Sequence, residues 1–229
     1  MPQVDQARLE RWQSAHAGEA QFWLRLPEEE FVRQAEGYAR LASQILHFYR
    51  ALLDPRERFR ALQIGCGVED VIFHLPEGEL FAVDPLADFY KAHFERSRSP
   101  RVDYRNAMGE DIPHDAGFFN IVICQNVMDQ CADCRVVMQE IVRVLAEPHL
   151  LVFATDVYSE VTAARRWEAD RRGEIHDVNH PHTFTERTLD GLLVDHGLEV
   201  VHRVPRLSSG KGDDSWRHCV FATRQVSRA

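Results

Sequence analysis

The spacing of apolar residues over positions 28–53 predicts a long amphipathic helix near the start of the chain. Apolar side chains recur there at steps of three and four, at Phe31, Ala35, Tyr38, Leu41, Ile45, Phe48 and Leu52. Steps of this size place side chains on one face of a helix. Pro27 precedes the pattern and Pro55 follows it. We therefore expect residues 1–55 to form a helical cap, which serves either for packing or as a lid over a binding site.

From residue 58 onward, short apolar runs alternate with helical patterns. Five runs fit buried strands, at 61–64, 80–83, 102–104, 121–124 and 150–153. Between them, two stretches have the spacing of helices, at 86–96 and 135–145. Strands that alternate with helices predict right-handed crossovers and a parallel sheet.

The C-terminal part departs from this alternation. Residues 185–196 predict a helix that Gly197 caps. Two strands follow, at 199–204 and 218–223, joined by a flexible connection that includes residues 207–214. Two successive strands with no helix between them predict an antiparallel hairpin beside the parallel strands.

The composition of the 229-residue chain, 45% hydrophobic and 28% charged, is that of an ordinary globular protein. A formal net charge of −9 repels a phosphate backbone, which argues against nucleic acid as the partner. No apolar run approaches the roughly 18 residues that cross a membrane, and the first residues lack the pattern of a secretion signal. Five cysteines, an odd number, do not indicate a disulfide framework. We therefore expect a cytoplasmic protein with no membrane partner.

Two glycines follow the first predicted strand, in the segment Leu62-Gln-Ile-Gly-Cys-Gly67. Glycine permits a positive φ and a close approach of the backbone to a ligand, although such turns also occur for purely structural reasons. A dinucleotide site has a third glycine at the position that Asp70 occupies here, preceded by Glu69. Two carboxylates at this turn repel a pyrophosphate, which argues against a nicotinamide cofactor.

Asp84 ends the second predicted strand, in the segment Val83-Asp-Pro85. A carboxylate at this place accepts hydrogen bonds from ribose hydroxyls in nucleotide-binding α/β folds. The structural alternative is a helix cap, a common role of aspartate after a strand. Its distance from Gly67 favours ribose binding, and the two features together indicate a nucleoside ligand that need not carry phosphate.

Three further segments follow in order, namely Met108-Gly-Glu-Asp-Ile-Pro113, Phe119-Asn-Ile-Val-Ile-Cys-Gln-Asn-Val-Met-Asp129 and Met138-Gln-Glu-Ile-Val-Arg-Val-Leu145. With the glycine turn and Asp84, they resemble class I S-adenosylmethionine-dependent methyltransferases of the small-molecule type. The resemblance covers roughly residues 58–229 and implies a methyltransferase domain at 56–229. The implied fold class is α/β, with a Rossmann-like, mostly parallel seven-stranded sheet, an antiparallel C-terminal hairpin and the N-terminal helical cap.

The resemblance implies S-adenosylmethionine as the cofactor and assigns residues to its parts. Those that border the methionine part and the ribose are Gly65, Cys66, Gly67, Asp84 and Leu86. Those near the adenine and beneath the sulfonium are Gly109, Glu110, Asp111, Gln125 and Asn126. Met108 departs from the family, whose members often have an acidic side chain there for the adenine amino group. Adenine recognition is therefore expected to use backbone atoms around Gly109 and Glu110, or Asp111.

The acceptor is expected at the segment His176-Asp-Val-Asn-His-Pro-His-Thr-Phe184, which follows the fifth strand. A histidine titrates near neutral pH and can act as a general base or a hydrogen-bonding anchor, so His180, His182 and Asp129 are the catalytic candidates. The structural alternative is a turn that leads into a helix cap. The candidate acceptor contacts are Tyr158, His180, His182, Trp23 and Tyr38. No second motif accompanies the histidines, so we expect no metal site.

Other features carry less weight. Cys131 and Cys134 have the spacing of a redox or zinc pair, but a single pair that opens a helix favours a structural role. Paired arginines at 165–166 and 171–172 form either a solvated helix face or a contact for an acidic substrate. The leading hypothesis is methyl transfer from S-adenosylmethionine to a nitrogen or oxygen of a small-molecule acceptor. The alternatives are a protein of the same fold with a non-methylating tailoring reaction, and a nucleoside-binding module.

Overall fold

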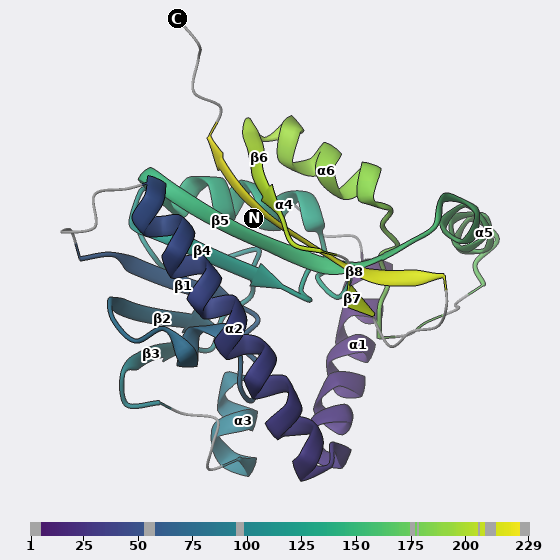
Figure 1. The fold of residues 1–229 in the computed structure, drawn as a ribbon. Coiled ribbons are helices and arrows are strands. Elements are labelled where there is room, and N and C mark those ends of the chain that lie inside the picture. Colours follow the sequence, from purple (N-terminus) through teal and green to yellow (C-terminus); the bar gives the residue numbers. More distant parts are fainter. Residues whose placement is uncertain are drawn as a thin grey trace, which may run out of the picture.

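A central sheet organises the computed structural model, which describes residues 6–52, 58–94, 99–174, 177, 179–205, 207–208 and 214–224. The strand order is β3-β2-β1-β4-β5-β8-β6, and β7 pairs with β8 (Figure 1). The strands are β1 Arg60–Ile64, β2 Glu79–Val83, β3 Val102–Arg105, β4 Phe119–Gln125, β5 Leu145–Tyr158, β6 Leu198–Arg203, β7 Leu207–Ser208 and β8 Ser215–Arg224. Strands β1 to β5 pair in parallel, whereas β8 is antiparallel to β5, β6 and β7. The predicted mostly parallel sheet with an antiparallel C-terminal hairpin is confirmed.

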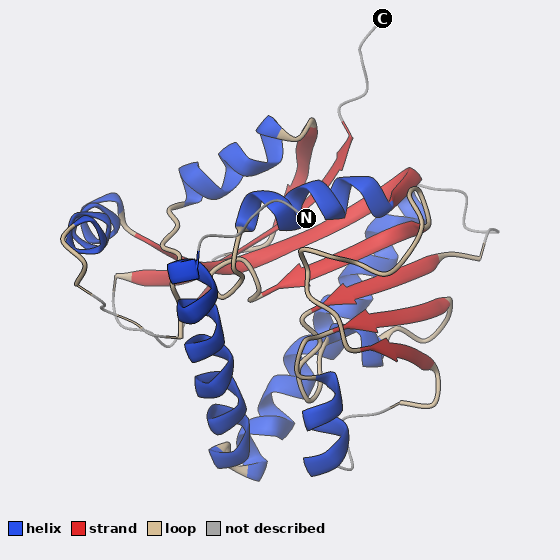
Figure 2. Ribbon diagram, turned by 180° about the vertical axis from the view of Figure 1, so that it is seen from behind, coloured by secondary structure: helices blue, strands red, loops and turns tan. Residues whose placement is uncertain are grey.

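Helices cover both faces of the sheet. They are α1 Gln6–Arg25, α2 Glu28–Leu52, α3 Ala87–His93, α4 Cys134–Val144, α5 Glu160–Arg171 and α6 Glu186–Asp195, with a short 3-10 helix η1 at Val71–His74. Helix α2 packs on one face, while α4 and α6 pack on the other, as the two opposite views show (Figures 1 and 2). The central strands read as continuous apolar runs because both of their faces are buried.

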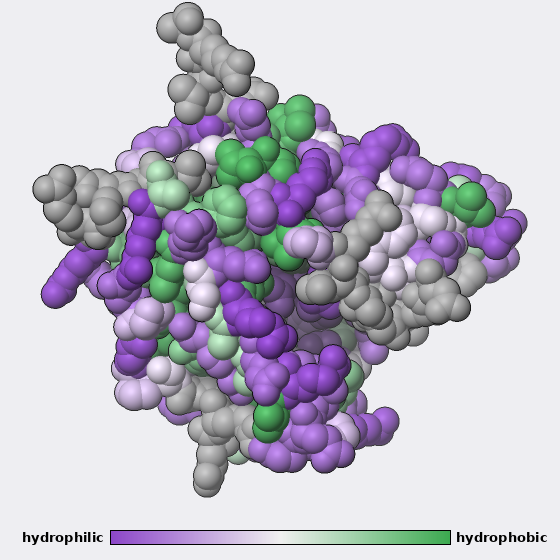
Figure 3. Space-filling view, in the orientation of Figure 1, coloured by the Kyte–Doolittle hydropathy of each residue, from purple (hydrophilic) through white to green (hydrophobic). Residues whose placement is uncertain are grey.

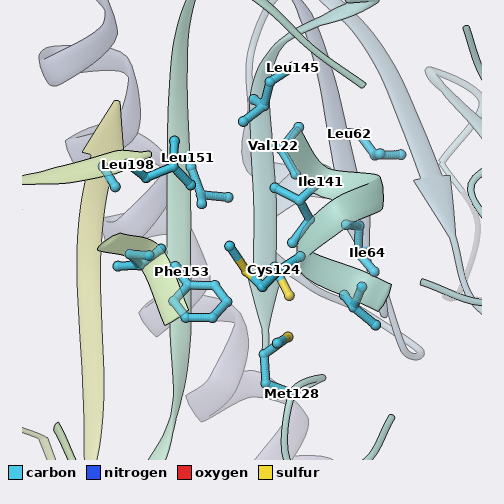
Figure 4. Packing of buried hydrophobic residues seen from close by; sticks show 14 of the residues in the cluster. Leu62, Ile64, Val122, Cys124, Met128, Ile141, Leu145, Leu151, Phe153 and Leu198 are labelled. Carbon is cyan, nitrogen blue, oxygen red and sulfur yellow. The ribbon is translucent and has the colours of Figure 1, made fainter. Parts of the chain in front are cut away.

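The core between the sheet and α4 shows how the periodicities of helix and strand combine. Val137, Met138, Ile141 and Val144 form the buried face of α4. They meet Leu62, Ile64, Val122 and Cys124 of the two central strands (Figure 4). Burying an aliphatic side chain of this size contributes about 1.5–3 kcal/mol. This packing holds the carboxyl ends of β1 and β4 side by side.

The structure extends the predicted elements in three places. The segment around Trp23 belongs to a 20-residue helix, α1, for which the sequence indicated only two aromatic residues before Pro27. Strand β5 continues to Tyr158, because its pairing with β8 runs on to Ser215. Within the connection expected to be flexible, Leu207–Ser208 form β7. The remaining described residue of that connection, Asp214, forms a turn before β8.

The two N-terminal helices diverge from the break at Pro27. Helix α2 runs back across the sheet, whereas α1 stands beside the carboxyl ends of the parallel strands (Figures 1 and 2). Ligands of open α/β sheets bind at that edge. Helix α1 therefore lies where a ligand would enter.

Candidate active site

The turn after β1 requires glycine at two positions. Gly65 and Gly67 have φ angles of +67° and +53°, and Cys66 between them is buried. A Cβ on residue 65 would lie 2.3 Å from Cγ2 of Val127, in the segment after β4. The backbone N–H of Gly65 donates to the carbonyl of Val83 at 2.8 Å, which joins the turn to the end of β2. The predicted glycine turn thus lies directly over the carboxyl edge of the sheet.

Asp84 links the two loops that border this edge. One carboxylate oxygen accepts from the backbone N–H of Gly67 at 3.0 Å, and the other accepts from that of Leu86 at 2.8 Å. The residue is 6% exposed. Asp84 therefore has a structural role at this edge, and ribose binding by its carboxylate stays a prediction.

Polar atoms without partners mark the same edge. Asn126, just past β4, has a φ of +55°, and its buried Oδ1 has no hydrogen-bond partner among the described residues. Gln63, the last residue but one of β1, is fully buried, and neither polar atom of its amide has a hydrogen-bond partner among the residues that the structure describes. A buried polar group without a partner costs about 1–3 kcal/mol, and a backbone outlier of this kind points to a functional site. Together with the glycine turn and Asp84, these atoms fit the polar parts of S-adenosylmethionine.

The three residues predicted near adenine have different surroundings. Glu110 accepts from the backbone N–H groups of Ala132 and Asp133 at 2.7 and 3.0 Å, so its side chain holds the segment before α4. Burial raises the pKa of Glu110. Gly109 lies over β1 and α4, with Ile64 and Val137 at 3.2 and 3.3 Å from the position of a Cβ. Asp111 is exposed. Because the Glu110 side chain is used within the protein, the backbone around Gly109 is the better candidate for adenine.

The two candidate histidines play different parts. His182 is bound to the segment after β4 in two ways. Its ring nitrogen Nε2 lies 2.7 Å from the carbonyl oxygen of Cys131, and its backbone N–H donates to the carbonyl of Asp129. His180 instead has Nδ1 at 2.9 Å from a carboxylate oxygen of Asp177 and Nε2 at 4.0 Å from one of Asp129. The structure therefore brings His180 and Asp129 together, while His182 fixes the loop. His176 lies outside the described residues.

Helix α1 completes the site with the predicted Trp23 and with Glu19, which the sequence did not indicate. Trp23 covers Gly67 so closely that a Cβ added to residue 67 would lie 2.9 Å from a carbon of the indole ring. The indole N–H of Trp23 donates to Glu19 at 2.7 Å. Burial raises the pKa of Glu19, and the nearby carboxylates of Asp84 and Asp129 act in the same direction. The helical spacing of Glu19 and Trp23 was the available signal, but it does not show which face of α1 meets the sheet.

On the α2 side, the site contains an arginine that the sequence analysis also missed. Arg217 on β8 donates from Nε to Asp156 of β5 at 2.5 Å. Tyr38 of α2 and Asp70 of the glycine loop lie close enough to interact electrostatically with this guanidinium. The surface between α1 and α2 is hollowed and mainly hydrophilic (Figure 3). Tyr38 and Trp23 thus both lie at this edge, on different helices.

Tyr158, another predicted acceptor contact, packs beneath α5. The guanidinium carbon of Arg166 lies 4.5 Å from the centre of its ring. Its backbone N–H donates to the carbonyl of Phe184 at 2.9 Å. A cation over an aromatic face contributes about 0.5–1 kcal/mol at an exposed site. Tyr158 therefore contributes to the attachment of α5.

Burial gives Asp70 an unusual titration. Its side chain accepts from the backbone N–H of Val71 at 2.6 Å as the cap of η1. Burial raises the pKa of Asp70 to about 8, the Val71 N–H and Arg217 lower it, and Asp84 and Glu69 raise it further. The folded protein thus holds a proton here through a pH range in which the unfolded chain releases it. The free energy of unfolding therefore falls as the pH rises through that range.

An Asp70→Asn variant is expected to remove this loss of stability. Asparagine keeps an oxygen that accepts from Val71 but carries no titrating proton. One pKa unit corresponds to about 1.4 kcal/mol, and the variant should gain at least that much relative to the wild type between roughly pH 5 and pH 8. Urea unfolding of both proteins at the two pH values measures the difference. Parallel changes in the two proteins would show that Asp70 ionises normally.

Other predicted features have structural surroundings. The thiol of Cys131 is buried and donates to the carbonyl of Met128 at 3.3 Å, and burial raises its pKa well above the ordinary value. Among the described residues, no group of three histidine, cysteine or acidic side chains is arranged to hold a metal ion. No helix in this part of the chain is both long and apolar enough to cross a membrane.

Known proteins show the same fold and sequence pattern. A family model described as a methyltransferase domain matches residues 31–203, about three quarters of the chain. YrhH of Bacillus subtilis (strain 168), whose methyltransferase activity is itself inferred, is 30% identical to this chain over 115 residues. That match covers 46% of this chain and 62% of the relative, so the chain spans about three fifths of the relative's length.

Solved structures with little sequence identity share the architecture. A structure from Methanosarcina mazei, described as an S-adenosylmethionine-dependent methyltransferase, has a TM-score of 0.60 at 18% identity and covers 80% of this chain and 97% of its own. The [4+2]-cyclase SpnF has a TM-score of 0.61 at 16% identity, with coverage of 82% and 81%. At these identities the likeness concerns the fold.

Proposed function

The chain belongs to the methyltransferase domain family and has the class I fold, and we propose that it transfers a methyl group from S-adenosylmethionine to a nitrogen or oxygen of a small-molecule acceptor. The observation that carries this proposal is the glycine turn at Gly65–Gly67, tied by Asp84 to the end of β2 at the carboxyl edge of the sheet. The turn lies between the carboxyl ends of β2 and β4, where an acceptor has access to the donor.

The residues at this edge divide the cofactor between them. Gly65, Cys66 and Gly67 hold the methionine part, while Asp84 and Leu86 hold the ribose. The adenine lies near Gly109, Glu110 and Asp111, and Gln125 and Asn126 face the sulfonium. S-adenosylmethionine supplies an already activated methyl group, so the protein mainly has to align the acceptor with it. Trp23 of α1, which covers Gly67, excludes water from this arrangement.

An acceptor that must lose a proton needs a base, and His180 has the geometry for that role. When the Nδ1 proton is donated to Asp177, Nε2 is left as an acceptor that faces Asp129. An oxygen acceptor within hydrogen-bonding distance of Nε2 can transfer its proton to His180. A neutral amine needs only orientation, and the same two side chains can provide it. His182 supports this loop through the carbonyl of Cys131.

The first 55 residues are proposed to be a cap that closes the site, with the methyltransferase domain at 56–229. Two contacts of α1 support this proposal. Trp23 rests on Gly67, and a Cβ at Gly18 would overlap the side chain of Asn179, in the loop that holds His180. Helix α1 therefore spans the cofactor side and the acceptor side together.

The proposed function is tested with S-adenosylmethionine that carries a labelled methyl group. The purified protein is incubated with a panel of small amines, phenols and carboxylates, and the label is followed by mass spectrometry. Label in a small-molecule product is expected. If the cofactor binds and no member of the panel is methylated, the result favours a non-methylating reaction on the same fold or a nucleoside-binding module.

A His180→Gln variant is expected to methylate a phenol about a hundredfold more slowly than the wild type, because a positioned base contributes at least this factor. Its affinity for S-adenosylhomocysteine should be unchanged. Methylation of an amine held neutral should fall much less. His47→Gln, an exposed change on α2, serves as the matched control. Equal rates for the phenol in wild type and His180→Gln would remove His180 from proton transfer.

A further inference from the structure

We propose that Arg217 binds a carboxylate, or a comparable oxyanion, of the methyl acceptor, so that the acceptor is an acidic small molecule. This inference rests on the proposed function. It names the class of acceptor, which the family and the fold leave open.

The position of Arg217 follows from the pairing of β5 with β8. Asp156 lies opposite Arg217 in this antiparallel pair. Their side chains lie on the α2 face of the sheet, because Ala154 and Cys219, two positions away on each strand, pack in the α2 cluster. Along this face, the apolar pattern of β5 changes to a buried carboxylate as the strand reaches its carboxyl end. Arg217 therefore extends toward the edge where the acceptor is expected.

The guanidinium is held in place yet still has free donors. Its Nε donates to Asp156, which is 4% exposed, and this single bond fixes the plane of the group. The two terminal nitrogens make no hydrogen bond to any residue that the structure describes, and 23% of the side chain remains exposed. A planar fork of this kind matches a carboxylate with two parallel hydrogen bonds.

Three acidic side chains interact with the charge of Arg217. Asp156 is its one ion-pair partner in the described part of the chain. Asp129 is also near enough to interact, but it faces His180 at 4.0 Å. Burial raises the pKa of Asp70 to about 8, so this neighbour is largely protonated at neutral pH. Half-buried Tyr38 of α2 also interacts electrostatically with Arg217, while its hydroxyl donates to Gln34 at 3.5 Å.

A carboxylate at Arg217 has two sources, the acceptor or the methionine part of the cofactor. The strand order favours the acceptor. The glycine turn belongs to β1, and β4 and β5 lie between β1 and β8. Adjacent strands are about 4.8 Å apart, so the backbone of Arg217 lies three strand spacings from that of the turn, although its guanidinium interacts electrostatically with Asp70, which follows the turn. Its guanidinium interacts electrostatically with Asp129, whose carboxylate lies 4.0 Å from Nε2 of His180, the proposed base.

The experiment uses acceptor pairs that differ only in a carboxylate or an amide, such as 4-hydroxybenzoate with 4-hydroxybenzamide and glycine with glycinamide, within a wider panel of acids and amides. The wild-type protein is expected to favour the acid by at least about tenfold in kcat/KM. Arg217→Met should erase this preference, and Arg217→Lys should keep part of it. The exposed α4 variant Arg135→Met should leave it unchanged.

Calorimetry with S-adenosylhomocysteine separates the two sources. An unchanged Kd in Arg217→Met supports the acceptor, whereas a rise of about tenfold or more assigns Arg217 to the cofactor's carboxylate and overturns the inference. A wild-type preference for the amides also overturns it, whether or not the variants fold. That outcome leaves the proposed function intact. Absence of transfer to every member of the panel contradicts the proposed function, and the inference with it.

Discussion

The Gly65→Ala variant is expected to lose about 2–5 kcal/mol of the free energy of unfolding. The left-handed conformation costs an L-residue about 1–2 kcal/mol, and Gly65 has a φ of +67°. The added methyl would also lie 2.3 Å from Val127, and overpacking of this kind costs typically about 1–3 kcal/mol. Urea unfolding of variant and wild type measures the loss. The variant should also bind S-adenosylhomocysteine poorly, because the turn must shift.

Gly117→Ala is the matched control for this experiment. Gly117 has a φ of +66°, nearly the same as that of Gly65, but nothing lies within 4 Å of the position of its Cβ. The control should therefore lose only the conformational part, about 1–2 kcal/mol. The difference between the two variants isolates the contact with Val127. Equal losses would show that the turn has room for a side chain and is not closely packed against the segment after β4.

The Asp84→Ala variant is expected to bind S-adenosylhomocysteine about 5- to 150-fold more weakly, which corresponds to about 1–3 kcal/mol. The change removes the acceptor proposed for the ribose hydroxyls. It also releases the backbone N–H groups of Gly67 and Leu86, which hold the two bordering loops in place. Isothermal titration calorimetry of a variant that remains folded measures the effect, and methyl transfer should fall at least in proportion at low cofactor concentration.

Asp103→Ala provides the comparison for Asp84→Ala. Asp103 lies on β3 with a half-exposed side chain and pairs with Arg105 at the surface. It carries the same charge, but it takes no part in the loops around the glycine turn. Its removal should leave the Kd within about twofold of the wild type. If Asp84→Ala also stays within that range while its circular dichroism is unchanged, Asp84 does not bind the cofactor.

Site residues that directly follow a single strand could be predicted from the sequence. The turn at Gly65–Gly67 and the carboxylate of Asp84 each follow a short apolar run, and parallel strands bring their carboxyl ends to one edge. The structure places these residues within hydrogen-bonding distance, with 3.0 Å between the Gly67 nitrogen and Asp84. The order of strands and helices likewise follows from local periodicity, which is why the fold class is confirmed.

Features that depend on how distant segments meet could not be predicted in the same way. Arg217 enters the site because of its register with Asp156, and no local pattern on β8 reveals that register. His180 and His182 are two residues apart in an irregular loop, where spacing does not determine direction. The structure binds His182 to Cys131 and turns His180 toward Asp129. Glu19 enters only because α1 docks against the turn through Trp23.

The most direct test of the account is a crystal structure of the protein with S-adenosylhomocysteine, and the decisive measurement is the distance from the ribose hydroxyls to the carboxylate of Asp84. We predict hydrogen-bond distances of about 2.5–3.0 Å, with the methionine part over Gly65–Gly67 and the sulfur facing Gln125 and Asn126. The account also predicts that Arg217 lies beyond the sulfur and away from the methionine carboxylate. A ligand bound elsewhere on the protein, or bound at this edge without contact to Asp84, would contradict the assignment of the methyl-donor site.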